Sequence, residues 1–165
     1  MTLGYRFKRK INNIYSLGWI INCNLKSFDI KQNALKIFPT NIISEKEKLL
    51  TRNLALGLYN RFNFGKRGNY IGNFIDVGAN FEWNFYPTFV INNKNIFNAS
   101  LSGNTKQIQS NLKFNNASNY CIAAALGFNK YVIYSTYRLS NIFRNSFNFP
   151  ELPRFIVGLQ LGLHQ

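Results

Sequence analysis

The sequence is poor in acidic residues, in cysteine and in long apolar runs. Six Asp and Glu stand against twenty Lys and Arg, which gives a net charge of +14. The two cysteines, Cys23 and Cys121, are too few for a disulfide scaffold, and their predicted strand parities place them on opposite faces. No stretch of about 18 apolar residues is present, which excludes a transmembrane helix.

Residues that commonly carry catalysis or bind metals are also scarce. The only histidine, His164, lies one residue from the end of the chain. A single histidine, two separated cysteines and scattered acids make no metal-ligand cluster. No Ser–His–acid spacing and no glycine-rich phosphate loop can be identified. We therefore expect no enzymatic activity, no cofactor and no metal site.

The basic surplus alone would favour an anionic partner such as nucleic acid. Charged residues, however, make up only 16% of the chain, and aromatic residues make up another 16%. A nucleic-acid-binding sheet would interleave lysines with exposed aromatic residues on one face, whereas the lysines of this chain collect in turns and loops. We therefore expect no nucleic-acid partner.

Apolar and polar residues alternate with period two over much of the chain, which predicts β-strands with one apolar face. The segment NFIDVGANFEWNF, residues 73–85, has Asp76 and Glu82 on one parity, and on the other parity it has Ile75, Val77, Ala79, Phe81, Trp83 and Phe85. The segment RFIVGLQLGLHQ, residues 154–165, alternates in the same way. The pattern predicts seven strands, at about 2–8, 14–30, 47–64, 70–92, 106–128, 131–143 and 153–164.

The connections between these strands alternate between short and long. Short turns are predicted at 9–13, 65–69 and 129–130, and long loops at 31–46, 93–105 and 144–152. Outer-membrane barrels have short periplasmic turns and long external loops. The alternation therefore predicts a single all-β domain, residues 1–165, folded as an antiparallel up-and-down transmembrane β-barrel.

Strand parity predicts eight strands in the complete barrel. If the last strand ends in the periplasm, the strand at 2–8 starts outside, where a barrel with an even number of strands cannot begin. The first residues, MTLGYRFKRK, are strand-like and form no signal peptide. We therefore expect the chain to lack its first strand and its signal peptide, with a strand supplied by a partner chain as the alternative.

Glycine lies on the polar parity in six of the seven predicted strands. Glycine would weaken a strand whose polar face meets water, whereas the narrow lumen of an eight-stranded barrel needs small residues beside a few large polar ones. The apolar parity is therefore predicted to face lipid. On the last strand the lipid-facing residues are Phe155, Val157, Leu159, Leu161 and Leu163.

Charged residues on the inward parity predict a charge network in the lumen, formed by Arg61, Asp76, Glu82 and Arg138. Buried charges persist only when they are paired, so we expect arginines to bind both acids. Such a network would brace the barrel. An anion-selecting path, suggested by the surplus of arginine, is the less favoured alternative because eight strands leave little open lumen.

Aromatic residues cluster near the ends of the predicted strands. Membrane barrels carry aromatic girdles at both interfaces, so this distribution predicts interfacial positions; the alternative is that aromatic residues simply favour strands. The predicted interfacial residues are Tyr15, Trp19, Trp83, Tyr86, Tyr131 and Tyr137.

Longer motifs lie in the second half of the chain: LYNRFNFGKRGNYIGNFIDVGANFEWNF at 58–85, GFNKYVIYSTYRLSNIF at 127–143, and FPELPRFIVGLQLGL at 149–163. They resemble outer-membrane β-barrel proteins of the Bacteroidota type, the grouping that includes PorT-like proteins. In that grouping a Y-R-L-S strand, here residues 137–140, precedes a loop and an L-P-R-x-x-V-G-L strand, here residues 152–159. The resemblance implies a barrel without catalytic residues, and PorT-like members are implicated in protein secretion through the outer membrane.

The sequence thus predicts a non-enzymatic protein of the bacterial outer membrane, a structural or accessory component that belongs to a secretion or envelope complex. Its partners would be outer-membrane lipid and proteins that contact the long loops 31–46, 93–105 and 144–152. The alternative is a soluble β-barrel that binds a lipid or another apolar ligand in its interior, with the apolar parity buried and the glycine-bearing parity in water.

Overall fold

The computed structural model of residues 1–165 describes all but 40–41, 65–71, 99–100, 111, 129–130 and 162–165, and also leaves the side chains of 94–98 and 101–104 undescribed. The described chain is all-β apart from a short 3-10 turn at Asn145–Phe147. Its strands are β1 (Thr2–Lys10), β2 (Tyr15–Ile30), β3 (Lys46–Phe64), β4 (Asn73–Asn84), β5 (Thr88–Asn98), β6 (Leu101–Ser110), β7 (Ser118–Phe128), β8 (Tyr131–Arg138) and β9 (Phe155–Leu161). Among the described residues, no helix is long and apolar enough to span a membrane.

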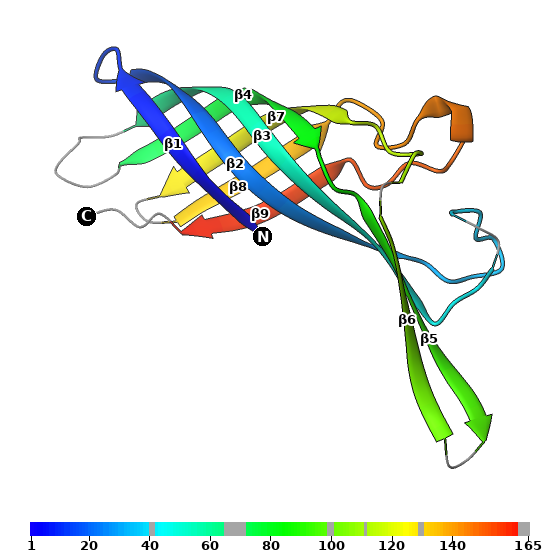
Figure 1. The fold of residues 1–165 in the computed structure, drawn as a ribbon. Helices are drawn as coiled ribbons and strands as arrows, with labels where there is room; N and C mark the ends of the chain where they lie inside the picture. Colours follow the sequence, from blue (N-terminus) through cyan, green and yellow to red (C-terminus); the bar gives the residue numbers. More distant parts are fainter. Residues whose placement is uncertain (40–41, 65–71, 99–100, 111, 129–130, 162–165) are drawn as a thin grey trace.

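Seven strands form one continuous antiparallel sheet in the order β1-β2-β3-β4-β7-β8-β9. Figure 1 shows that this sheet curls into a half-barrel. The all-β antiparallel class predicted from the sequence is confirmed. Strands β1 and β9 are the two edges of the sheet and are not paired with each other in the described part of the chain.

Strands β5 and β6 form a hairpin outside this path, and here the sequence-based prediction was wrong. Strand β5 pairs with residues 46–50 of β3, and β6 pairs with β5, so that the hairpin projects away from the half-barrel (Figure 1). Most of the predicted loop 93–105 is therefore strand. The predicted strand 70–92 is broken at 85–87, where Pro87 cannot donate a backbone hydrogen bond. The predicted strand 106–128 is broken at the asparagine-rich segment 111–117.

The hairpin lies between β4 and β7, so the whole excursion 85–117 belongs to the same end of the sheet as residues 31–45 and 139–154. We call this end the loop end, and the opposite end, where β1 leads into β2, β3 into β4 and β7 into β8, the turn end. The predicted sorting of long and short connections is thus found, with a hairpin in place of one long loop.

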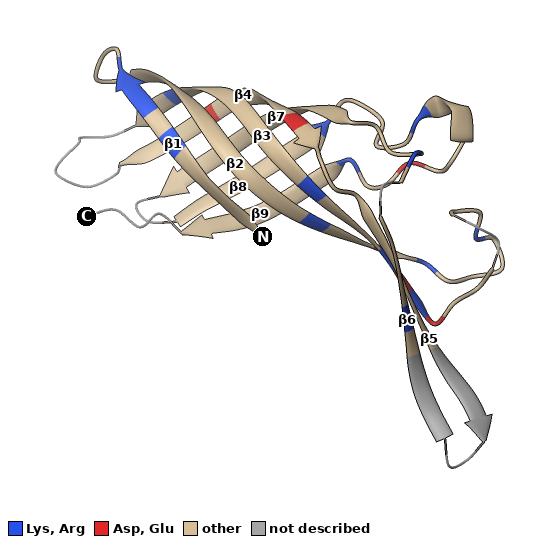
Figure 2. Cartoon of the chain, viewed as in Figure 1, with Lys and Arg blue, Asp and Glu red and all other residues tan. Residues whose placement is uncertain are grey.

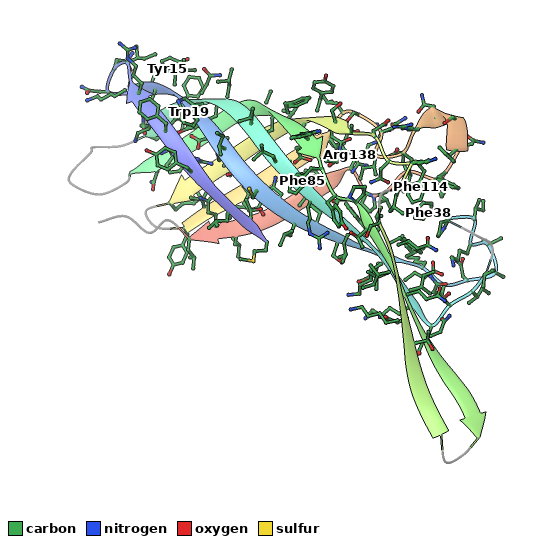
Figure 3. All side chains as sticks on the ribbon, in the orientation of Figure 1. Tyr15, Trp19, Phe38, Phe85, Phe114 and Arg138 are labelled. Carbon is green, nitrogen blue, oxygen red and sulfur yellow. The ribbon has the colours of Figure 1, made fainter. Side chains whose placement is uncertain are left out.

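An aromatic core fills the loop end. Its buried members come from the loop after β2, from β3, from β5 and from the loop after β8: Phe38, Leu49, Phe89, Ile142 and Phe143. Phe38 packs against Phe114 with ring centroids 5.3 Å apart, and both residues lie together beside the half-barrel in Figure 3. The predicted strand 131–143 ends at Arg138 because the chain beyond it turns into this core, where Ile142 and Phe143 are buried.

Candidate functional site

The curled sheet has an exposed apolar face and a buried polar face. Leu58, in the middle of β3, is 67% exposed, and Leu159 on β9 is 78% exposed. Exposed apolar side chains occupy this outward parity on all seven strands of the sheet. Examples from each strand, in sheet order, are Leu3, Tyr5, Phe7, Leu17, Ile21, Leu56, Leu58, Val77, Phe81, Ile122, Leu126, Ile133, Phe155, Val157 and Leu159.

The predicted lipid-facing set of the last strand lies on this face. Phe155, Val157, Leu159 and Leu161 are all exposed. Leu163, the fifth predicted member, lies outside the described residues. The side chains between them on β9 have the opposite parity, which follows from the period of a strand.

Charged residues are almost absent from the described outward positions of the sheet, and Arg9 at the end of β1 is the exception. This holds for the described strand residues 2–10, 15–25, 54–64, 73–84, 118–128, 131–138 and 155–161. In the cartoon of Figure 2, basic residues lie mainly toward the strand ends and in the loops, with a few within the strands. An apolar band free of charge therefore crosses the sheet.

Asn60 interrupts the outward apolar parity of β3, and the structure explains it. The Tyr15 hydroxyl donates a hydrogen bond of 2.6 Å to Asn60 Oδ1 across the β2–β3 pair. The tyrosine ring in turn packs on Phe62, with centroids 5.5 Å apart. The amide oxygen is thus hydrogen-bonded, which lowers the free-energy penalty of placing a polar group on an apolar face.

The predicted interfacial aromatics all lie on the outward face or at its border. Trp19, Trp83, Tyr86, Tyr131 and Tyr137 are exposed and Tyr15 is half-buried. Trp19 packs between Tyr5 and Phe7 of the neighbouring strand, and the Arg52 guanidinium lies 5.3 Å from the centre of the Tyr86 ring. Figure 3 shows Tyr15 near the turn end and Phe85 toward the loop end.

Asp76 is the centre of an inward charge cluster. Its carboxylate accepts two hydrogen bonds from Arg61, from Nε at 2.6 Å and from Nη2 at 2.7 Å, and a third from Arg6 Nη1 at 2.9 Å. Arg61 and Asp76 face each other directly across the β3–β4 pair, and both are buried, with 6% and 4% of their surface exposed. The structure thus places together Arg61 and Asp76, as the inward parity predicted.

Aromatic rings hold the two guanidinium groups of this cluster. Arg61 lies 3.5 Å from the centre of the Phe74 ring, and Arg6 lies 4.8 Å from the centre of the Tyr59 ring. The Tyr59 hydroxyl donates a 3.0 Å hydrogen bond to the carbonyl of Phe7. Strands β1, β3 and β4 are therefore cross-linked through their inward side chains.

Glu82 does not join Asp76, and among the residues that the structure describes it pairs with a lysine in place of the expected arginine. Both of its carboxylate oxygens accept hydrogen bonds from Lys26 Nζ, at 2.7 and 2.6 Å, and Asn53 Nδ2 donates a weaker one at 3.2 Å. Lys26 lies on the inward parity of β2, and this parity was the only feature of the sequence that indicated a place for it on the inward face. The register that brings it to Glu82, two strands away, depends on pairings that the sequence pattern does not define.

Arg138 has a different role from the one predicted. Its guanidinium donates to Glu151 Oε2 at 2.9 Å, to the carbonyl of Leu152 at 3.0 Å and to the carbonyl of Ser140 at 3.0 Å. All three acceptors belong to the loop between β8 and β9. Arg138 therefore clamps that loop at the loop end, where Figure 3 places it, and its ion pair in the described part of the chain is with Glu151 and not with Asp76 or Glu82.

Glycines on the inward face make room for aromatic rings of the adjacent strands. Gly18 faces Tyr59, Gly127 faces Phe74 and Gly158 faces Tyr134, each as a direct cross-strand pair: Gly18↔Tyr59, Phe74↔Gly127 and Tyr134↔Gly158. A Cβ atom at any of these glycines would lie inside van der Waals contact with the facing ring. The glycine-bearing parity is therefore the side on which space is short.

The described residues contain no group of three or more histidine, cysteine and acidic side chains that could hold a metal ion. Both cysteines are free, with Cys23 exposed and Cys121 buried. Comparison of the chain with protein-family models, with curated proteins and with solved structures gives no match. The arrangement itself defines the class: a curled antiparallel half-barrel that is apolar outside and charged inside.

Proposed function

We propose that this protein is a transmembrane β-barrel of the bacterial outer membrane, with eight strands around the closed barrel. One observation carries the proposal: bulky apolar side chains are exposed on all seven strands of the sheet, whereas Arg61, Asp76 and Glu82 are buried on the other face. Soluble monomers rarely expose a contiguous apolar patch larger than about 300–600 Å². Lipid is the solvent that suits a band of this extent.

The spacing of the outward aromatics supports the same proposal. On β7, Tyr120 and Phe128 enclose aliphatic outward residues, and on β8 Tyr131 and Tyr137 enclose the outward Ile133 and Ser135. Eight residues separate Tyr120 from Phe128, which at about 3.3 Å per residue and a tilt of about 40° corresponds to roughly 20 Å of height. This value is close to the apolar band of about 25 Å that outer-membrane barrels carry.

The soluble alternative requires the opposite burial. A barrel that binds an apolar ligand inside would bury the parity of Leu56, Leu58 and Phe81 and leave the parity of Arg61 and Asp76 in water. In the described structure Leu56, Leu58 and Phe81 are exposed, and Arg61 and Asp76 are buried. No observation on the described residues therefore favours an interior lipid site.

Within the membrane we propose a structural or accessory role. The inward side chains brace the barrel, since Asp76 and Glu82 each bind cations from other strands, and the clamped charges leave bracing favoured over an anion path. The contact surface for protein partners would be the loop end, with 31–45, the β5–β6 hairpin and 139–154. The likeness of the sequence to PorT-like proteins supports membership of a secretion or envelope complex.

A lipid-insertion assay tests the proposal. The chain, refolded with and without phospholipid vesicles, should sediment with the vesicles, resist carbonate extraction and show heat-modifiable gel mobility. Leu58→Arg, in the middle of the apolar band, should make insertion less favourable by about 2–4 kcal/mol. Phe64→Arg, at the strand end, should make it less favourable by about 1 kcal/mol or less. A monomer that folds in detergent-free buffer and ignores vesicles would contradict the proposal.

A further inference from the structure

The two edges of the curled sheet, β1 and β9, specify a strand that fits between them. Consecutive strands of the sheet are antiparallel along the whole path of seven. The first and last strands of an odd series therefore run in the same direction, and both arrowheads lie toward the turn end in Figure 1. One strand that runs toward the loop end would be antiparallel to both edges and would close the barrel, which removes the free strand edges.

A second copy of the chain does not fit this gap. If two copies share one orientation in the membrane, β1 of one copy meets β9 of the other, and these strands are parallel. If one copy is inverted, the edges become antiparallel, but the loop ends then lie on opposite sides of the membrane. A single added strand avoids both conflicts, because it is antiparallel to both edges and keeps the loop end on one side.

The residues that border the gap define the outward chemistry of this strand. Leu3, Tyr5 and Phe7 on β1 are exposed on the outward face, and so are Val157 and Leu159 on β9. A strand between them continues the same band only if its own outward residues are apolar. Cross-strand contacts between such residues are the main source of sheet stability on that face.

The inward chemistry is set by Arg6. Its guanidinium shares the single carboxylate of Asp76 with Arg61, so two positive charges there meet one negative charge. The Arg6 side chain is 28% exposed, whereas Arg61 beneath it is buried, and Arg6 Nε is a buried donor without a hydrogen-bond partner. A carboxylate on the inward face of the added strand would neutralise the surplus and accept that donor.

We propose that the gap between β1 and β9 binds one extended polypeptide strand, antiparallel to both edges, with apolar residues outward and a carboxylate inward beside Arg6. This inference rests on the proposed barrel function and adds the chemistry of the closing strand. The remaining inward positions of the strand are small, because Gly158 on β9 is already covered by the Tyr134 ring.

Synthetic strands of about ten residues, the length that crosses a barrel wall, test the proposal. Three fluorescent peptides share alternating Leu and Val outward residues and Gly and Ser inward residues, and differ only in a central inward Glu, Gln or Lys. They are titrated onto the detergent-solubilised chain, and binding is followed by fluorescence anisotropy. The Glu peptide should bind at least about tenfold more tightly than the Lys peptide.

Two variants of β1 separate the inward contact from general attraction of charge. Arg6→Gln should remove the preference for the Glu peptide, because the guanidinium that would bind the added carboxylate is lost. Arg9→Gln removes a charge from the outward parity of the same strand and should leave the preference intact. Equal binding of the three peptides to the unaltered chain, or equal effects of the two variants, would overturn the proposal.

Disulfide cross-linking locates the bound strand. In a Cys23→Ser background, one peptide with an outward cysteine should form a disulfide with Tyr5→Cys on β1 and, in a separate variant, with Val157→Cys on β9. Cross-linking to neither edge, or to one edge only, would overturn the proposal. A disulfide between two copies of the chain that the peptide does not displace would also overturn it, because a second copy would then occupy the gap. Vesicle insertion is measured separately from peptide binding. A chain that inserts but binds no peptide refutes this inference alone. A chain that binds the peptide but never inserts refutes the membrane function alone.

Discussion

At the scale of residues, the inward face is a set of complementary shapes. The Tyr59, Phe74 and Tyr134 rings each take the space above a glycine on the next strand. A glycine that weakens an isolated strand is here covered by a cross-strand aromatic ring, a device that stabilises sheet glycines. Sequence reasoning predicted that glycine belongs to the crowded face, but not which ring covers which glycine, because strand register decides that.

Gly127→Ala tests this fit. The new methyl group would meet the Phe74 ring, so we expect a loss of about 1–3 kcal/mol in the free energy of unfolding. Adding Phe74→Leu should recover part of that loss, because the smaller side chain gives way and the two changes are coupled. Urea midpoints of the two single variants and the double variant measure the coupling.

The matched control is Gly72→Ala, where the nearest atom to the new Cβ would be 3.9 Å away. A change of about 0.5 kcal/mol or less is expected there. Additive effects of Gly127→Ala and Phe74→Leu would show that the ring does not limit this position.

The Asp76 carboxylate should contribute strongly to stability, since two guanidinium groups depend on it. Asp76→Asn leaves Arg6 and Arg61 without a charge partner and should lower the free energy of unfolding by about 3–5 kcal/mol. The pair of the exposed Asp29 with the half-buried Lys48, at 3.4 Å, is the control, and Asp29→Asn should change the free energy of unfolding by about 1 kcal/mol or less. Similar losses in the two variants, measured by urea denaturation, would rule out a bracing role for Asp76.

At the scale of elements, alternation with period two located most strands because each buries one face only. The prediction failed between β4 and β7, because it continued one strand through Pro87 and another through the asparagine-rich segment 111–117. Both breaks have local signals, since proline removes a ladder donor and asparagine favours turns. The pairing of β5 with the extended end of β3 has no such signal, because it is a long-range contact.

The loop-end core and the hairpin tip should differ in importance. Phe89 is 1% exposed and packs on Phe38 with ring centroids 5.9 Å apart, so Phe89→Ala should lower the free energy of unfolding by about 3–5 kcal/mol. Replacing residues 94–105 by a short glycine-containing turn should change it by about 1 kcal/mol or less, because the backbone pairs of β5 and β6 in this part of the hairpin join these two strands to each other.

The same two proteins separate core from hairpin in function. The shortened hairpin should leave vesicle insertion unchanged, since the hairpin projects from the half-barrel (Figure 1). Loss of insertion on shortening would mean that the hairpin takes part in the membrane-spanning structure, which the proposed arrangement does not include.

At the scale of the whole molecule, the seven-stranded sheet is inverted relative to the sheet of a soluble protein: its apolar side chains are exposed on one face, and Arg61, Asp76 and Glu82 are buried on the other. The sequence contained this inversion as two parities, and the glycines on the polar parity indicated which of the two is inside. That Arg61 and Asp76 both lie on the inward face was predicted from parity, whereas their direct pairing depends on the β3–β4 register. The partners of Glu82 and Arg138 were not predictable, because one lies two strands away and the other lies in a loop.

The central claim is that the apolar band contacts lipid, and the two tryptophans of the chain report on it directly. Trp19 on β2 and Trp83 on β4 are both outward and exposed. In vesicles, lipids brominated on the acyl chains should quench the fluorescence of both, tested one at a time in Trp83→Phe and Trp19→Phe variants, while aqueous iodide should have little effect. Quenching by iodide and none by brominated lipid, at either tryptophan, would contradict the account.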